Sequence, residues 1–253
     1  MSRSVSPVSR AELLEYPRMI KFRLGLSVVH ASATLFNRTY PHVLHASIVP
    51  RPWYGVVRWL IDRLPCSWRR HLQAWFPGAF LPPRVVVKQL LRTDKGAAQL
   101  FDNEIRAYGR LQQVQGTAIP RFFGEGVCEG QRALVLSVVD GPTALEQQQP
   151  MPVEEFQQKM ETAHAHLEAG YMVYSDLKLD NVILAEDGRF VLIDLEFVVE
   201  PEDRPELRYR NAVLGFVDRY KHFLKIWADE QAERDRWEQV ARGGRHGFPP
   251  RAR

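Results

Sequence analysis

The stretch from Tyr171 to Phe197 constrains the fold of this chain more than any other part of it. Two short apolar runs, Val182–Leu184 and Phe190–Leu195, stand on either side of the turn residues Glu186-Asp187-Gly188. This pattern predicts a β-hairpin. A hairpin would bring the loop before it and the acidic residue at its end to one edge, where three polar side chains would converge. They are Asp176, Asn181 and Asp194.

These three side chains, two carboxylates and one amide, offer only oxygen atoms as ligands. Mg²⁺ prefers hard oxygen ligands and is commonly bound through one or two carboxylates together with the phosphates of a substrate. The hairpin therefore predicts a site for magnesium and for the phosphates that it carries.

The composition is that of a folded globular protein, with 253 residues, 45% hydrophobic and 25% charged. This length suits one domain or two small lobes that share a cleft. Cys66 and Cys128 are too few and too far apart for a disulfide framework or a zinc site, which favours a reducing compartment. No secretory signal and no apolar run of about 20 residues is present, so we expect an intracellular, cytoplasmic protein.

Positive charge is concentrated in the first part of the chain. Residues 1–92 carry 14 lysines and arginines against 3 acidic residues, a net charge of +11, while the remainder carries −7. The segment from Trp53 to Phe80 is also rich in tryptophan, and its apolar spacing predicts a short amphipathic helix before Pro65. Two interpretations are open: contact with an anionic membrane, nucleic acid or nucleotide, or a solvated basic face whose helix packs on the body of the protein.

A β-rich part precedes a helical part in the predicted order of elements. The turn residues Asp140-Gly141-Pro142 separate the two parts and predict a cleft near Asp140, while Met19–Tyr40 shows no clear period. The predicted division is a basic segment at 1–81, an N-lobe core at 82–139 and a C-lobe at 140–253. The predicted elements are a strand at Arg84–Leu90, a helix at Ala98–Gln113, strands at Arg121–Val127 and Ala133–Val139, a helix at Pro152–Ala169, the hairpin, and helices at about Leu207–Trp227 and Asp229–Arg242.

Two of these segments resemble the magnesium-binding motifs of protein kinases. The loop from Tyr174 to Asn181, Y-S-D-L-K-L-D-N, resembles the catalytic loop H-R-D-L-K-x-x-N and keeps the spacing from Asp176 to Asn181. Asp194-Leu195-Glu196 stands where these proteins have D-F-G, at the separation that one β-hairpin spans.

A third segment, Val85-Val86-Val87-Lys88, resembles the V-A-I-K strand, and Glu104 follows on a predicted helix at the place of the glutamate that pairs with this lysine. On these motifs the chain resembles the protein kinase-like superfamily. It is most similar to the small protein kinase-like proteins of fungi, on the side of the aminoglycoside and choline phosphotransferases. The resemblance covers roughly residues 82–198.

This resemblance implies an α+β, bilobal protein kinase-like fold with a β-rich N-lobe and a short helical C-lobe. It also implies ATP and Mg²⁺ as cofactors and a hydroxyl group, on a small molecule or a protein, as phosphoryl acceptor. The implied metal ligands are Asn181 and Asp194, and the backbone around Leu136 and Val138 would bind the adenine. The implied catalytic residues are Lys88 on the phosphates, Glu104 orienting that lysine, Asp176 accepting the hydroxyl proton, and Lys178 neutralising the transferred group.

The chain also departs from the kinase pattern. No G-x-G-x-x-G precedes Lys88, Tyr174 replaces the histidine of the catalytic loop, and Glu196 replaces the glycine of D-F-G. No A-P-E segment follows, and only 59 residues come after Asp194. Two functions are therefore expected: an active phosphotransferase, or a pseudokinase that serves as a nucleotide-binding or scaffold module. The acceptor and the oligomeric state stay open.

Overall fold

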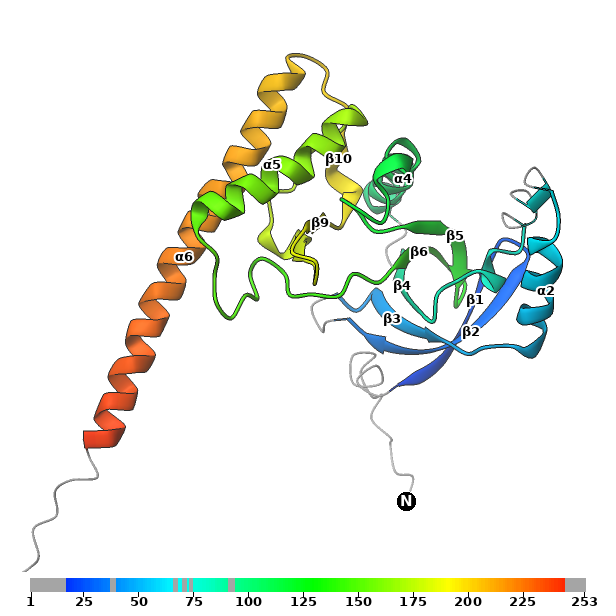
Figure 1. Cartoon of the computed structure of the whole chain (residues 1–253), viewed down its shortest axis with the longest axis horizontal. Coiled ribbons are helices and arrows are strands. Elements are labelled where there is room, and N and C mark those ends of the chain that lie inside the picture. The colour runs from blue at the N-terminus through cyan, green and yellow to red at the C-terminus, as the bar shows by residue number, and fades with distance from the viewer. Residues whose placement is uncertain are drawn as a thin grey trace, which may run out of the picture.

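Six antiparallel strands in the first half of the chain close into a β-barrel (Figure 1). The computed structural model describes residues 17–36, 40–65, 68, 69, 72, 75–90 and 94–243. The barrel order is β1-β2-β3-β4-β6-β5, and β1 closes it by pairing with β5, Phe22 opposite Cys128. The strands are β1 (Arg18–Leu24), β2 (Ser27–Leu35), β3 (Val43–Ile48), β4 (Arg84–Gln89), β5 (Phe122–Cys128) and β6 (Gln131–Ser137).

Alternation along each strand fills the barrel interior. Successive side chains of a strand point to opposite faces, so every second residue enters the core. On β4 this rule buries Val85 and Val87 and sends Lys88 to the outer face. The fully buried interior residues include small ones, which leave room for the larger side chains inside a narrow barrel. Among them are Ala31, Ala33, Ala46 and Ala133.

The predicted bilobal kinase-like fold is wrong. The closed six-stranded barrel takes the place of the predicted β-rich N-lobe, and two of its strands, β1 and β2, fall almost entirely within Met19–Tyr40, where the sequence shows no clear period. The alternation there is hard to see because several inward residues are alanines. The short helical C-lobe is also replaced, because the C-terminal segment forms one 39-residue helix, α6 (Pro205–Gly243).

The two helices predicted for the C-terminal segment are therefore continuous. No glycine or proline stands near the expected break at Ala228, so nothing in the backbone interrupts the helix. The charged side chains beyond the break are spaced for contact along one helix, and Arg234 lies 3.9 Å from Glu230.

The other helices cover the barrel and the hairpin. α2 (Pro52–Asp62) packs on the barrel through Tyr54 and Ile61, and α4 (Lys95–Arg110) begins where Asp94 caps the Ala97 amide at 3.0 Å. α5 (Val153–Ala169) packs on the first half of α6, with the rings of Phe156 and Tyr220 stacked at 3.9 Å. Of the helices in the described part of the chain, none is long and apolar enough to cross a membrane.

The predicted hairpin is confirmed, although it is shorter than expected. β8 (Val182–Leu184) pairs with β9 (Phe190–Leu192), and the two-residue strands β7 (Val173–Tyr174) and β10 (Val198–Val199) pair beside it. The predicted break at Gly141 is required by close packing, because a Cβ there would lie 2.0 Å from the carbonyl oxygen of Leu184. Short 3-10 turns complete the fold: η1 (Pro77–Ala79), η2 (Gln112–Val114), η3 (Leu179–Asn181) and η4 (Leu195–Phe197).

Candidate active site

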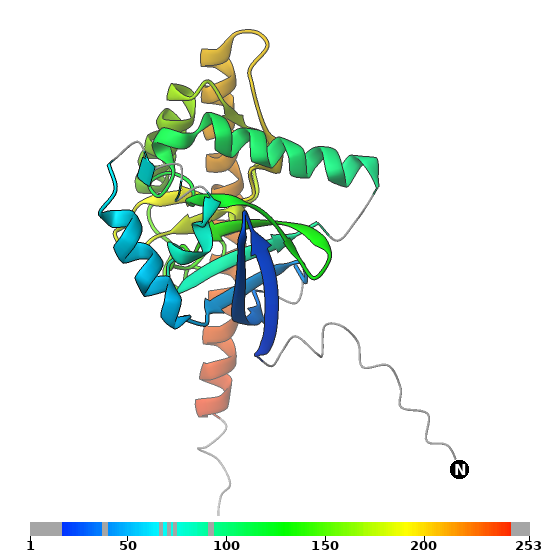
Figure 2. The same cartoon turned by 90° about the vertical axis from the view of Figure 1, so that its right-hand side faces the viewer.

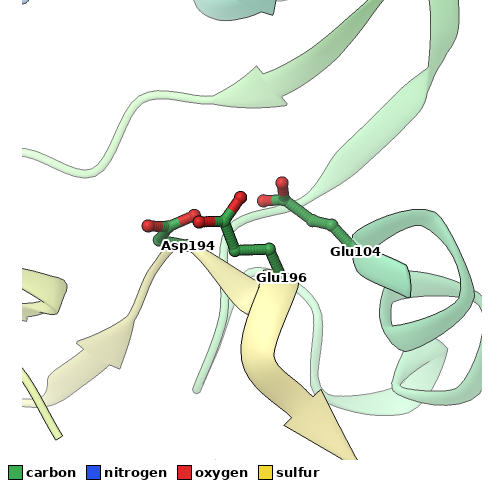
Figure 3. A group of neighbouring side chains, drawn as sticks. All are labelled: Glu104, Asp194 and Glu196. Atoms are coloured by element: carbon green, nitrogen blue, oxygen red, sulfur yellow. The ribbon is translucent and has the colours of Figure 1, made fainter. Parts of the chain in front are cut away.

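Lys88 lies at the centre of the candidate site. Its ammonium donates to Glu104 Oε2 at 2.7 Å and contacts Asp194 Oδ1, and Glu196 Oε2 lies 3.8 Å away. Figure 3 shows the three carboxylates converging, Glu104 from α4 and the other two from the segment between β9 and β10. The sequence-predicted pair of Lys88 and Glu104 is therefore formed, and Asp194 joins it.

Helix α4 is fixed to the segment that carries the acidic residues. The side-chain amide of Asn103 donates to the carbonyl oxygens of Glu196 and Val198, both at 2.8 Å. Asn103 precedes Glu104, so these bonds set the position at which the fully buried Glu104 faces Lys88. These bonds join α4 to the segment between β9 and β10.

Asp194 adopts a left-handed backbone conformation, with φ of 60° and ψ of 66°. This conformation is uncommon for a residue with a Cβ, and such residues cluster at functional sites when their surroundings hold them in place. The hydroxyl of Tyr174 contributes to that restraint, since it donates to the carbonyl oxygens of Ile193 and Asp194. Tyr174 therefore supports the Asp194 backbone.

The loop after β7 positions Asp176. Its Oδ2 accepts from the Lys178 ammonium at 2.8 Å and from the Asn181 amide at 3.0 Å. The Ile193 amide donates to the Asn181 carbonyl at 2.9 Å, which ties this loop to the end of the hairpin. Because Asn181 donates its NH₂ group to Asp176, its amide oxygen is the atom that a metal would meet.

A cavity of about 250 Å³ adjoins these residues. It brings together Lys88, Glu104, Asn181 and Asp194, whereas Asp176, Lys178 and Val138 lie outside its lining. Part of its wall is apolar. The apolar wall includes Val86, Leu136, Ile183 and Ile193.

Sequence reasoning missed the wall that the β2–β3 connection supplies. Phe36, Tyr40, His42 and His45 line the cavity from this side, together with Val43, which pairs with Lys88. The alternation along β3 buries Leu44 and leaves His45 to line the cavity. This alternation could have predicted the position of His45, but only if 43–48 had been recognised as a strand. On the far side, Thr143, Leu145 and Glu146 were also missed.

Burial and charge act in opposite directions on the central groups. Burial alone would lower the pKa of Lys88, but Glu104, Asp194 and Glu196 together raise it, so the lysine is positively charged. Burial raises the pKa of Glu104, and Lys88 partly offsets this effect. Burial also raises the pKa of Glu196, and the neighbouring charge of Asp194 adds to it. Burial lowers the pKa of His42, and Lys88 lowers it further.

The three carboxylates around Lys88 could serve as metal ligands. Oxygen atoms of Glu104, Asp194 and Glu196 lie within 4.8 Å of one another. The ammonium of Lys88 already contacts all three, so a cation at their centre would have to displace it. A divalent ion therefore fits better on the side of Asp194 that faces the cavity, where Asn181 also lies.

No protein-family model matches the chain, and no curated protein matches it. A functional assignment therefore rests on the side chains of the site.

Proposed function

We propose that this protein is an ATP- and Mg²⁺-dependent phosphotransferase that transfers a phosphoryl group to a hydroxyl acceptor. The observation that carries the proposal is the joint contact of Lys88 with Glu104 and Asp194 beside the loop that holds Asp176 and Asn181. Phosphoryl transfer needs positioning and charge neutralisation more than covalent chemistry, and these residue types supply both. The motifs that resemble the protein kinase-like superfamily agree with this proposal.

The nucleotide would occupy the cavity, with its base against the apolar wall and its phosphates at Lys88. Lys88 has two close partners and three donors, so on losing Asp194 as a partner it would keep Glu104 and turn its other donors to phosphate oxygens. Bound Mg²⁺ would neutralise charge on the phosphates. Asn181 and Asp194 present the oxygen atoms to hold it.

Asp176 would orient the acceptor hydroxyl and accept its proton. Its carboxylate is held by Lys178 and Asn181, so it does not need to reorganise when the acceptor arrives. The side chain of Lys178 is more exposed than that of Asp176, and it would approach the transferred phosphoryl group.

The acceptor would bind in a second cavity, of about 800 Å³, between the catalytic loop and α6. This cavity shares Leu145 and Asp180 with the nucleotide cavity, so the two lie side by side. Phe223 and Trp227 of α6 give it aromatic surface, and its wall also holds charges of both signs. These features suit a partly apolar molecule with polar groups.

A nucleotide-binding module without catalysis is the second candidate. Two features favour it: no G-x-G-x-x-G precedes Lys88 and the aromatic side chains of Phe36 and Tyr40 line the cavity, and Glu196 adds a negative charge 3.8 Å from the lysine. Binding of Mg-ATP with no turnover, measured by thermal shift and by ATP consumption, would support this candidate.

The decisive experiment compares γ-phosphate transfer from labelled ATP, with a library of hydroxyl compounds, in the wild type and in Asp176→Asn. We expect the substitution to lower transfer by about 100-fold or more, as for loss of a general base. Asp187→Asn is the matched control, because this exposed aspartate lies in the turn between β8 and β9, outside the lining of both cavities. Equal transfer by the wild type and Asp176→Asn would contradict the proposed function.

A further inference from the structure

The outward face of α2 carries large apolar side chains. Trp53, Val56, Trp59 and Leu60 are 43%, 58%, 54% and 52% exposed. A helix that packs on a globular body ordinarily turns polar residues to the solvent. Contiguous exposed apolar surface of this kind marks a site of interaction.

This orientation of α2 is fixed by contacts on its inner side. Ile61 is buried, and the hydroxyl of Tyr54 donates to the Val28 carbonyl at 3.1 Å. The guanidinium of Arg58 donates to the Leu81 carbonyl at 3.1 Å and also to the Ala79 carbonyl. The polar anchors thus face the protein, and the apolar side chains are held outward.

The segment that contains α2 is rich in positive charge. Residues 49–81 contain five arginines against one acidic residue, and four of the six tryptophans of the chain. The guanidinium of Arg63 lies 3.7 Å from the centre of the Trp59 ring. Trp68 and Trp75, beyond the helix, are 67% and 59% exposed. The surface therefore combines arginine and tryptophan with aliphatic side chains.

We propose that this α2 face binds the surface of a lipid bilayer that contains anionic headgroups. A helix with apolar and aromatic residues on one face and arginines beside them lies in the plane of the interface, with its apolar side chains among the acyl chains. Tryptophan and arginine suit this depth because each has an apolar body and a polar end. The positive charge complements the anionic headgroups.

A bilayer fits this face better than a nucleic acid. Val56 and Leu60 are more than half exposed between the tryptophans, and aliphatic side chains make no favourable contact with phosphates. The placement of α2 also agrees, since it lies on the opposite side of the barrel from α6 (Figures 1 and 2). A membrane under α2 would leave the α6 side of the candidate site open to the solvent.

Flotation of the full-length chain with vesicles tests the proposal. Vesicles of phosphatidylcholine alone are compared with vesicles that also contain phosphatidylserine, at low and high salt. We expect binding to the second kind only, weakened by salt, and about 10-fold weaker in the double variant Trp59→Ser, Leu60→Ser. Trp237→Ser is the matched control, because Trp237 is 68% exposed on α6 and its loss should leave binding unchanged.

Two further measurements separate the explanations. Brominated lipids should quench the tryptophan fluorescence of the wild type and of Trp237→Ser. Arg63→Glu should weaken binding without loss of folded structure, since Arg63 is exposed. The proposal is overturned if the wild type does not bind the anionic vesicles, if the double variant binds them equally well, or if the chain binds RNA through α2 while it ignores vesicles.

Discussion

The hydroxyl of Tyr174 donates a hydrogen bond to the backbone carbonyl of Asp194, the residue whose carboxylate contacts Lys88. Tyr174 is buried on the short strand β7, and Asp194 follows β9 in a left-handed conformation. Strain of this kind costs about 1–3 kcal/mol and persists only where the surroundings enforce it. The tyrosine is one of the groups that enforce it.

Removal of this hydroxyl should destabilise the protein. Tyr174→Phe leaves the carbonyl oxygens of Ile193 and Asp194 without this donor, and we expect the free energy of unfolding to fall by about 1–3 kcal/mol. Urea unfolding followed by fluorescence measures the change. Tyr171→Phe is the control, because Tyr171 is 52% exposed. Similar losses in both variants would show that Tyr174 does not restrain Asp194.

Loss of the central lysine should be most harmful at neutral and alkaline pH. Lys88→Met leaves Glu104, Asp194 and Glu196 without a cation, and breaking a buried ion pair costs about 3–5 kcal/mol. Burial and mutual repulsion would raise the pKa values of Glu104 and Glu196 further in this variant. A raised carboxyl pKa favours folding once the group is protonated, so the deficit should shrink as the pH falls from 8 to 5.

The measurement for Lys88→Met is urea unfolding at both pH values, beside Lys221→Met. Lys221 is exposed on α6 and lies 3.8 Å from Asp218, so its loss should change the free energy of unfolding by about 0.5 kcal/mol or less at either pH. A deficit for Lys88→Met that does not depend on pH would mean that the carboxylates do not protonate in its absence.

The parts of the site that depend on local sequence were predictable. The turn residues 186–188 predicted the hairpin, and the resemblance of Val85-Val86-Val87-Lys88 to the V-A-I-K strand predicted the pairing of Lys88 with Glu104. The contact of Asp194 with Lys88 joins residues 106 positions apart in the chain. It depends on packing between elements that no local pattern reveals.

Barrel closure is the main feature that the sequence did not reveal. It depends on β1 pairing with β5, for example Phe22 with Cys128, which are distant in the chain. β-strand preference depends strongly on such neighbours, so the alanine-rich alternation of β2 gives little signal alone. The part of the cavity wall formed by Phe36, Tyr40 and His42 was missed for the same reason, because its position follows from the pairing of β2 with β3.

Acid should destabilise the protein through His164 on α5. This histidine is buried with its Nδ1 3.1 Å from the Met160 carbonyl, and burial lowers its pKa to about 4. A lowered pKa gives stability that is present above the ordinary pKa of about 6.5 and is lost as the pH falls toward 4. The free energy of unfolding should fall by about 3 kcal/mol, because a pKa difference of one between the folded and unfolded protein corresponds to about 1.4 kcal/mol.

The comparison that isolates this effect uses His164→Gln and His166→Gln. His166 lies two residues along α5 and is exposed, so its variant should follow the wild type across the range. The unfolding free energy of His164→Gln should fall less steeply between pH 6.5 and 4 than that of the wild type. Parallel curves for all three proteins would exclude His164 as the origin of the acid sensitivity.

Glu196 should weaken nucleotide binding in the absence of metal. Its carboxylate lies 3.8 Å from the Lys88 ammonium and competes with phosphate for the same positive charge. We expect Glu196→Gln to bind ATP about 10-fold more tightly in the presence of a chelator, because one negative charge fewer then faces the phosphates across a few ångströms of partly buried site. Isothermal titration calorimetry measures the change.

Glu186→Gln, in the exposed hairpin turn, is the control and should bind ATP as the wild type does. Unchanged or weaker binding by Glu196→Gln would mean that the phosphates do not approach Lys88 from the side of Glu196.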